Sequence, residues 1–366
     1  MKITFPHMGN LNITAKALFS ALGQEVIDPP PCTKKTLALG NQHSPEGVCL
    51  PFKINMGNFL EAAELGADTI VLTGGCGPCR FGYYGEVQRE ILHDLGYKYD
   101  LVVLEAEKNS KGQGLIEKIK FLGNGKSYLD IMAALRIAWH KTKAVDAVEM
   151  EVQRMRAHEA VQGTCDKIYN HALKRIDKAE NVKVISAVVA ISLEEIRKIK
   201  TRIHADIIRI GLIGEIYTII EPFANLNIER HLGKLGAEVR RSLYLSQWAN
   251  DHLFGGILQA QTRRTFIKKA QSYLPYDIGG HAKETIGSAA YFAEQNYDGI
   301  IQVAPLTCMP EIIGQAILPY LASDKNIPFM TLYVDGQSGE AGLITRLEAF
   351  CDLVRQRKKS KLKESV

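Results

Sequence analysis

The sequence lacks the features that mark a membrane or secreted protein. None of its hydrophobic runs approaches the roughly 20 residues that a helix needs to cross a bilayer. The first residues, MKITFPHMGN, contain no charged segment followed by an apolar one, so they do not resemble a signal peptide. We therefore expect a soluble, cytoplasmic protein with no membrane partner.

An excess of charge of one sign is missing from most of the chain. The 366 residues carry a formal net charge of +5, and the last twelve, from Arg355 on, hold six basic residues and one acidic residue. This tail therefore accounts for the whole net charge. Since a neutral body offers no broad attraction to phosphates, nucleic-acid binding is not expected. We expect the tail to be a frayed, solubilising terminus.

Two nucleotide-binding motifs are also absent. The chain has no G-x-x-x-x-G-K-[ST] loop, and no G-x-G-x-x-G stands between a predicted strand and a following helix. ATP binding by this chain is therefore not expected, and any ATP-driven step would use a partner.

Short strand-like runs alternate with helical patterns at both ends of the sequence, which is typical of parallel α/β layers. The predicted strands are 1–5, 25–27, 69–73, 101–105, 207–213, 238–245, 299–304 and 329–334. The stretch between these two sets is mostly helical in composition. We therefore predict an α/β protein with two Rossmann-like parallel-sheet domains, which an ancient duplication could have produced. The domains are 1–127 and 205–354, with a helical linking segment 128–204 and the basic tail 355–366.

Five of the seven cysteines lie in loop-like segments flanked by proline or glycine. These are Cys32, Cys49, Cys76, Cys79 and Cys308. Cys76 and Cys79 follow a predicted strand directly, as does Cys308, and ligands of open parallel sheets bind beyond the carboxyl ends of the strands. The remaining two, Cys165 and Cys351, lie in helical stretches, where we expect buried thiols that act as small hydrophobes.

The C-x-x-C pair has three interpretations: a redox disulfide, half of a zinc site, or ligands to an iron-sulfur cluster. A thioredoxin-like disulfide requires a different strand context and leaves the other loop cysteines unexplained. The same residues could supply the four ligands of zinc. Because Cys49 and Cys79 lie in the first domain and Cys308 in the second, the arrangement favours a cluster in the inter-domain cleft. Zinc and unrelated cysteines stay as alternatives.

Seven long stretches carry a resemblance to a known family. They are FPHMGN, SPEGVCLPFKINMGNFLEAAELGADTI, GGCGPCRFGYYGEVQREIL, GEIYTIIEPFANLNIERHLGKLGAEV, LPYDIGGHAKETIG, DGIIQVAPLTCMPEIIGQAILP and DGQSGEAGLITRLEAF. They resemble the 2-hydroxyacyl-CoA dehydratase-related superfamily, and more narrowly its activase-related (CoA-protein activase-like) branch, to which double-cubane cluster proteins are related. The resemblance covers nearly the full chain.

The resemblance implies an oxygen-sensitive 4Fe-4S cluster between two Rossmann-like domains. It also implies reduction by a separate ATP-hydrolysing iron-sulfur activator of the ASKHA type, and pairing with a similar subunit as a homo- or heterodimer. Three metal ligands carry over by position to Cys49, Cys79 and Cys308. Cys76 and Cys32 are extra thiolates, which could close the iron that dehydratases leave open or hold a second cubane.

The implied function is a difficult reduction or dehydration driven by low-potential electrons. A double-cubane reductase of small molecules and a non-catalytic electron-transfer subunit are the alternatives. A CoA thioester substrate is suggested by the resemblance alone.

Four further residues could support a cluster. Lys53 and Arg80 follow ligand candidates closely and could supply positive charge, with ordinary surface cations as the alternative. Gly75 and Gly77 could let backbone N–H groups approach the sulfides, although a glycine there could instead serve the turn.

Two residues are candidates for acid-base chemistry. His7 follows the first strand and could donate to a cluster or substrate, with a structural histidine as the favoured alternative. Glu215 follows the first strand of the second domain and could be a general base or a helix cap. For Glu215 we favour the catalytic role, and for Glu340, which opens the last predicted helix, the cap.

Overall fold

The computed structural model contains two compact units, which we describe separately. It describes residues 1–74, 79–104, 114–202, 206–258 and 262–364. Unit 1 comprises Met1–Val145, Ile176–Ile185 and Leu245–Gln261, and unit 2 comprises Asp146–Arg175, Ser186–Tyr244 and Thr262–Val366. Each unit contains a four-stranded sheet in which every pair of neighbouring strands is parallel. The predicted α/β class with two parallel sheets is confirmed.

The sheet of unit 1 has the order β2-β1-β3-β4. Its strands are β1 (Lys2–Thr4), β2 (Glu25–Val26), β3 (Thr69–Thr73) and β4 (Asp100–Leu104). They coincide with the predicted strands to within a residue or two, because each is a short apolar run between turn-forming residues. Thr69 is paired with Ile3 on one side and with Asp100 on the other.

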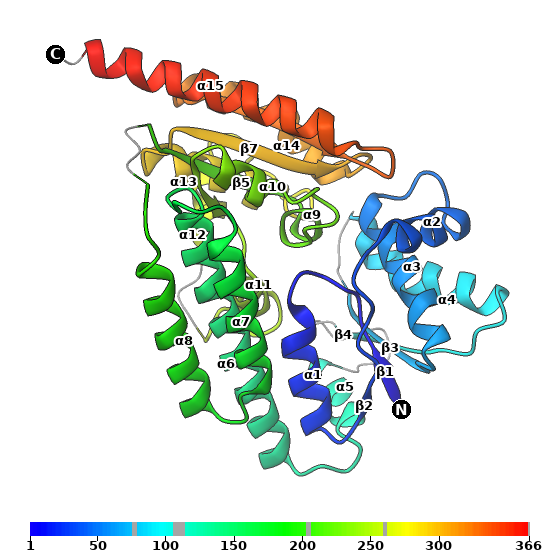
Figure 1. Cartoon of the computed structure of the whole chain (residues 1–366). Coiled ribbons are helices and arrows are strands. Elements are labelled where there is room, and N and C mark those ends of the chain that lie inside the picture. Colours follow the sequence, from blue (N-terminus) through cyan, green and yellow to red (C-terminus); the bar gives the residue numbers. More distant parts are fainter. Residues whose placement is uncertain (75–78, 105–113, 203–205, 259–261, 365–366) are drawn as a thin grey trace. The chain divides into compact units, whose positions relative to one another are not determined.

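Helices cover both faces of this sheet (Figure 1). Side chains alternate along β3, so Val71 packs with α1 (Leu11–Ala21) and the end of α5 (Leu115–Leu122), whereas Ile70 and Leu72 pack with α3 (Leu50–Glu64) and α4 (Tyr84–Asp94). The unit therefore has three layers. Cys32 and Cys79 lie in the segments that follow the carboxyl ends of β2 and β3, and Cys49 lies between α2 (Lys34–His43) and α3.

Helix α2 (Lys34–His43) packs backbone to backbone against α3. A Cβ on Gly57 would lie 1.9 Å from the carbonyl oxygen of Thr36, and one on Gly40 would lie 1.7 Å from that of Lys53. No side chain fits at either position, so the two glycines allow the close approach. The contact fixes the start of α3, where Cys49 lies.

The middle of the chain is helical, as predicted. It forms α6 (Tyr128–Met155), α7 (Thr164–Lys178) and α8 (Val182–Arg197), and α8 includes the apolar run that begins at Val182. Helix α11 (Leu245–His252) returns to unit 1. Among the helices of the described ranges, none combines the length and the apolar character that a membrane span requires.

The sheet of unit 2 has the order β6-β5-β7-β8, which is the order of unit 1 element for element. Its strands are β5 (Ile208–Gly214), β6 (Ala237–Arg241), β7 (Gly299–Pro305) and β8 (Phe329–Val334). The helices α12 (Thr262–Ala270), α13 (Ala282–Glu294) and α14 (Met309–Asp324) pack together with β5 and β7. Two short helices, α9 (Ile216–Ile220) and α10 (Ile228–Lys234), connect β5 to β6.

The close helix contact within unit 1 has a counterpart within unit 2. A Cβ on Gly287 of α13 would lie 1.9 Å from the carbonyl oxygen of Phe266 in α12, which matches the contact between Gly57 and Thr36. A shared strand order and a shared helix contact are what a duplication predicts.

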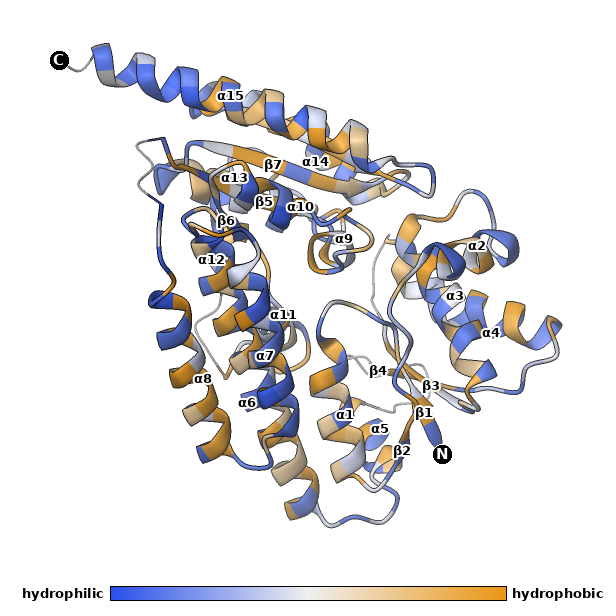
Figure 2. Cartoon of the chain, in the orientation of Figure 1, coloured by the Kyte–Doolittle hydropathy of each residue, from blue (hydrophilic) through white to orange (hydrophobic). Residues whose placement is uncertain are grey.

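The basic tail is not frayed in the described residues, contrary to our expectation. Helix α15 runs over Glu340–Glu364, and its hydrophilic end is seen in Figure 2. Lys358 donates to Asp298 at 2.9 Å and to the carbonyl oxygen of Ile207 at 3.0 Å, and Lys359 pairs with Asp206 at 2.7 Å. Lys358 and Lys359 therefore bind α15 to neighbouring segments of unit 2, although their charges suggested a solvated terminus.

Both cysteines that we assigned to helix packing are buried in helices. Cys165 lies in α7 and Cys351 in α15, and each is fully buried. Burial raises the pKa of both thiols, that of Cys351 to about 11. The prediction that both thiols are buried in helices is confirmed.

Candidate functional site

The described thiols of unit 1 lie where helices begin. Cys49 is the N-cap of α3 and Cys79 is the N-cap of the short helix η1 (Arg80–Tyr83), and neither position has a side-chain capping bond. Cys32 directly precedes Thr33, which caps α2 through a capping box. Because the N-terminus of a helix presents free N–H groups and a positive dipole end, it favours thiolate over thiol.

Cys49 lies in an apolar environment and has a polar contact with Tyr84. Its sulfur is hydrogen-bonded to the hydroxyl of Tyr84. The Tyr84 ring packs edge-on against Phe52 at 4.9 Å and Phe81 at 5.6 Å between ring centroids. Cys49 itself is 9% exposed. The sulfur is thus shielded from water while one hydroxyl can stabilise negative charge on it.

Arg80 joins the Cys79 segment to the Cys49 loop. Its Nη1 donates to the carbonyl oxygen of Gly47 at 2.5 Å, two residues before Cys49. Lys53 lies in α3 one turn after Cys49 and is half-buried. The structure therefore brings the two segments with Cys49 and Cys79 together, whereas a role of Lys53 and Arg80 in tuning a cluster stays a prediction.

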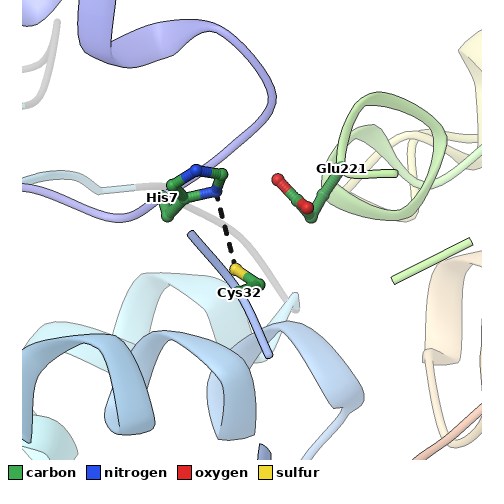
Figure 3. Close-up of side chains that lie close together, drawn as sticks. All are labelled: His7, Cys32 and Glu221. Carbon is green, nitrogen blue, oxygen red and sulfur yellow. Dashed lines mark hydrogen bonds between the residues drawn. The ribbon is translucent and has the colours of Figure 1, made fainter. Parts of the chain in front are cut away.

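Cys32 and His7 form a second group in unit 1. The Cys32 sulfur lies 3.5 Å from His7 Nδ1, and Figure 3 shows the two side chains turned toward each other. It also lies 3.6 Å from Asn58 Oδ1. The Asn58 amide is oriented by its Nδ2, which donates to the carbonyl oxygen of Pro30 at 3.3 Å. Asn58 was missed by sequence reasoning, because nothing marks this asparagine within a helical segment.

Three of the predicted site residues, Gly75, Cys76 and Gly77, lie outside the described residues. The proposed roles of Cys76 as a ligand and of the two glycines as N–H donors therefore stay predictions.

In unit 2, Cys308 repeats the placement of Cys49. It follows β7, caps α14 without a side-chain bond and is 8% exposed. Both helices have proline as their second residue, Pro51 in α3 and Pro310 in α14. The preceding Thr307 has φ of 70°, which is strained for a β-branched residue. A strand, a strained turn and a helix start thus fix the position of the Cys308 backbone.

Glu311 is a buried carboxyl in the first turn of α14. Thr285 donates to its Oε1 and Gln302 to its Oε2, both at 2.8 Å, and Thr331 donates to Gln302 at 3.0 Å. Burial raises the pKa of Glu311 to about 7. Sequence reasoning did not single out Glu311, because a glutamate in the first turn of a helix is ordinarily a favourable charge near the positive end of the helix dipole.

Glu215 caps a helix. Its carboxylate accepts from the N–H groups of Tyr217 and Thr218, each at 3.0 Å, and burial raises its pKa. Both carboxylate oxygens thus accept hydrogen bonds from N–H groups of α9, as expected of a helix cap, which was the alternative to a catalytic role. The catalytic role of Glu215 stays a prediction. Glu340 is the first residue of α15 and lies 3.0 Å from His231 Nε2.

Comparison with family models gives no match for this chain, and comparison with curated proteins gives none either.

Proposed function

We propose that this protein is an iron-sulfur protein of the 2-hydroxyacyl-CoA dehydratase type. It takes low-potential electrons from an ATP-hydrolysing activator and drives a difficult reduction or dehydration. The observation that carries the proposal is the placement of Cys49, Cys79 and Cys308, each at the N-cap of a helix. The activator and a paired similar subunit enter the proposal through the sequence resemblance.

These residues fit a cluster by their donor chemistry. Thiolates are the usual protein ligands of iron-sulfur clusters, and helix N-termini stabilise the negative charge that such ligands carry. The proposed ligands are Cys49, Cys79 and Cys308, and Cys76 is the favoured fourth. A bound 4Fe-4S cluster supplies one-electron redox chemistry.

The surrounding residues have separate tasks. The hydroxyl of Tyr84 is hydrogen-bonded to the sulfur of Cys49, and to a Cys49 thiolate it would donate and withdraw electron density from the sulfur. Phe52 and Phe81 hold the Tyr84 ring in place through edge-on contacts. Arg80 keeps the Cys49 loop next to the Cys79 segment through Gly47.

Metal and sulfide analysis tests this proposal. We expect anaerobically purified protein to contain about four iron and four sulfide per chain, with an EPR signal after reduction; about eight irons would indicate a double cubane. Colourless protein with stoichiometric zinc alone would refute the proposal.

Cysteine variants test the ligand set. Cys308→Ala should lose the cluster, whereas Cys351→Ala, which removes a buried thiol from α15, should keep it. A Cys308→Ala protein with a full complement of iron and sulfide contradicts the proposed ligand set. Cys76→Ala separates a catalytic site from an electron carrier, because a site with an open iron tolerates the loss of Cys76 and a closed one does not.

A further inference from the structure

Two helices of unit 2 begin next to each other at the Cys308 segment. Thr285, in the first turn of α13, donates to Glu311 Oε1, in the first turn of α14, at 2.8 Å. The N–H of Thr285 donates in turn to the carbonyl oxygen of His281, the N-cap of α13, at 2.8 Å. Cys308 is the N-cap of α14 and lies three residues before Glu311. His281 and Cys308 therefore lie at neighbouring helix ends, each about one turn from a direct contact between the helices.

The corresponding part of unit 1 holds two of the proposed cluster ligands. From Gly57 to its counterpart Gly287, and from Cys79 to Cys308, the distance along the chain is the same to within one residue. Cys79 caps the helix that follows β3, and Cys308 caps the helix that follows β7. The two cysteines are therefore counterparts in the duplicated fold.

His281 corresponds in turn to Cys49. Each is the N-cap of the helix before the same strand, α13 before β7 and α3 before β3, and neither makes a side-chain capping bond. Relative to the shared glycine, α13 begins two residues later than α3, and the imidazole is the longer side chain. Helix starts favour Ser, Thr, Asp and Asn. Capping therefore explains neither the cysteine nor the histidine, whereas a shared bound group explains both.

The backbone before α13 directs the imidazole inward. Gly279 and Gly280 have φ of 73° and 62°, which glycine adopts without strain, and Asp277 accepts from the N–H of Gly279 at 3.0 Å. The His281 side chain as a whole is partly exposed, but its Nε2 atom is buried. The far nitrogen of the ring thus faces the protein rather than the surrounding water.

An N–H donor at this position suits an iron-sulfur cluster. Thiolate ligands make such a cluster negative, and the charge grows when the cluster accepts an electron. Hydrogen bonds to the sulfurs therefore stabilise the reduced form and raise the reduction potential. A neutral imidazole carries one N–H, which it can donate without becoming a ligand.

We propose that His281 donates a hydrogen bond to the cluster on the side held by Cys308 and raises its reduction potential. The inference rests on the proposed function, because it requires a cluster at Cys308. His281 tunes the cluster from outside its ligand set, so the fourth ligand position stays with Cys76.

Anaerobic redox titration of the full-length protein tests this role. His281→Leu removes the donor, so it should lower the reduction potential while iron and sulfide stay at the content of the unaltered protein. His281→Gln keeps an N–H donor and should restore most of the potential. His93→Leu, at an exposed position of α4, is the matched control and should leave the potential unchanged.

Isotope labelling of the histidine nitrogens gives a second readout. Pulsed EPR of the reduced protein should show a weak nitrogen coupling, as expected of a hydrogen-bonded imidazole, that is lost in His281→Leu. A strong coupling lost in the same variant would make His281 an iron ligand and overturn the proposal. If His281→Leu does not fold, loss of the coupling in labelled His281→Gln decides instead.

The outcomes distinguish this inference from the proposed function. If the unaltered protein contains no iron-sulfur cluster, the proposed function fails, and the role of His281 fails with it. If the protein holds its cluster and His281→Leu keeps the unaltered potential, only the role of His281 is overturned.

Discussion

The hydroxyl of Tyr84 is hydrogen-bonded to the sulfur of Cys49, although the two residues lie 35 positions apart in the chain. The contact joins the start of α4 to the N-terminus of α3 on one face of the sheet. It joins the sulfur to the hydroxyl of a ring that packs edge-on against Phe52 and Phe81.

Tyr84→Phe should separate the hydrogen bond from the packing. The ring contacts with Phe52 and Phe81 stay, so the free energy of unfolding should fall by only about 0.5–1.5 kcal/mol. If Cys49 binds the cluster, loss of the donor should lower the reduction potential, measured by an anaerobic redox titration. Tyr99→Phe is the matched control, since Tyr99 donates to the carbonyl oxygen of Phe59 instead. Equal potentials in both variants would contradict the ligand role of Cys49.

Glu311→Gln should change the pH dependence of stability. Burial raises the pKa of Glu311 from 4.5 to about 7, so between these pH values the folded state keeps a proton that the unfolded state has lost. The stability of the unaltered chain should therefore fall by up to roughly 3 kcal/mol as the pH rises from 4.5 to 7, and stay level above. Glu311→Gln should lack this component.

Denaturant unfolding at several pH values measures this effect. Glu348→Gln, at an exposed position of α15, is the control and should follow the unaltered chain. Parallel pH profiles for Glu311→Gln and the unaltered chain would show that Glu311 titrates normally. Glu215 and Glu284 interact electrostatically with Glu311, so the variant is compared with the unaltered chain at each pH.

Gly57→Ala should separate helices α2 and α3. The new Cβ would lie 1.9 Å from the carbonyl oxygen of Thr36, and backbone atoms cannot rotate away as a side chain can. We expect a loss of about 1–3 kcal/mol or more in the free energy of unfolding. Gly47→Ala, whose Cβ meets nothing within 4 Å, should cost little. Equal denaturation midpoints for the two variants would show that the helices are not in contact as described.

Glu149→Gln should destabilise unit 2 through a buried ionic cluster. Arg241 is almost completely buried and pairs with Glu149 and, at 3.4 Å, with Glu229. Removing the Glu149 charge leaves the guanidinium under-compensated, which costs about 3–5 kcal/mol. Glu194→Gln breaks an exposed pair with Lys198 and should leave the unfolding midpoint unchanged. A similarly small effect of both variants would contradict the buried cluster.

The strands were predictable because their signals are local. The runs Thr69–Thr73 and Phe329–Val334 are apolar and bounded by turn-forming residues, and both strands have the predicted bounds. The basic tail was mispredicted for the opposite reason. Six basic residues look like a solvated terminus until the partners, such as Asp298 and Asp206, are brought alongside α15 by the fold.

The site was predictable only in part. Cys49 and Cys308 were singled out because each lies in loop-like sequence with a proline two residues after it, but Tyr84, Asn58 and Glu311 were not. Each of the three lies in a helix of ordinary composition. Its contact is with a residue at least nine positions away in the chain, so no local pattern marks it.

The sequence by itself determined the α/β class, the strands and the residue types available for chemistry, because hydrophobic periodicity and turn residues act over a few positions. The tertiary structure alone decided which donors meet. Parallel strands carry loops far apart in the chain to one edge of a sheet, and there the sulfur of Cys32 meets His7 and that of Cys49 meets Tyr84.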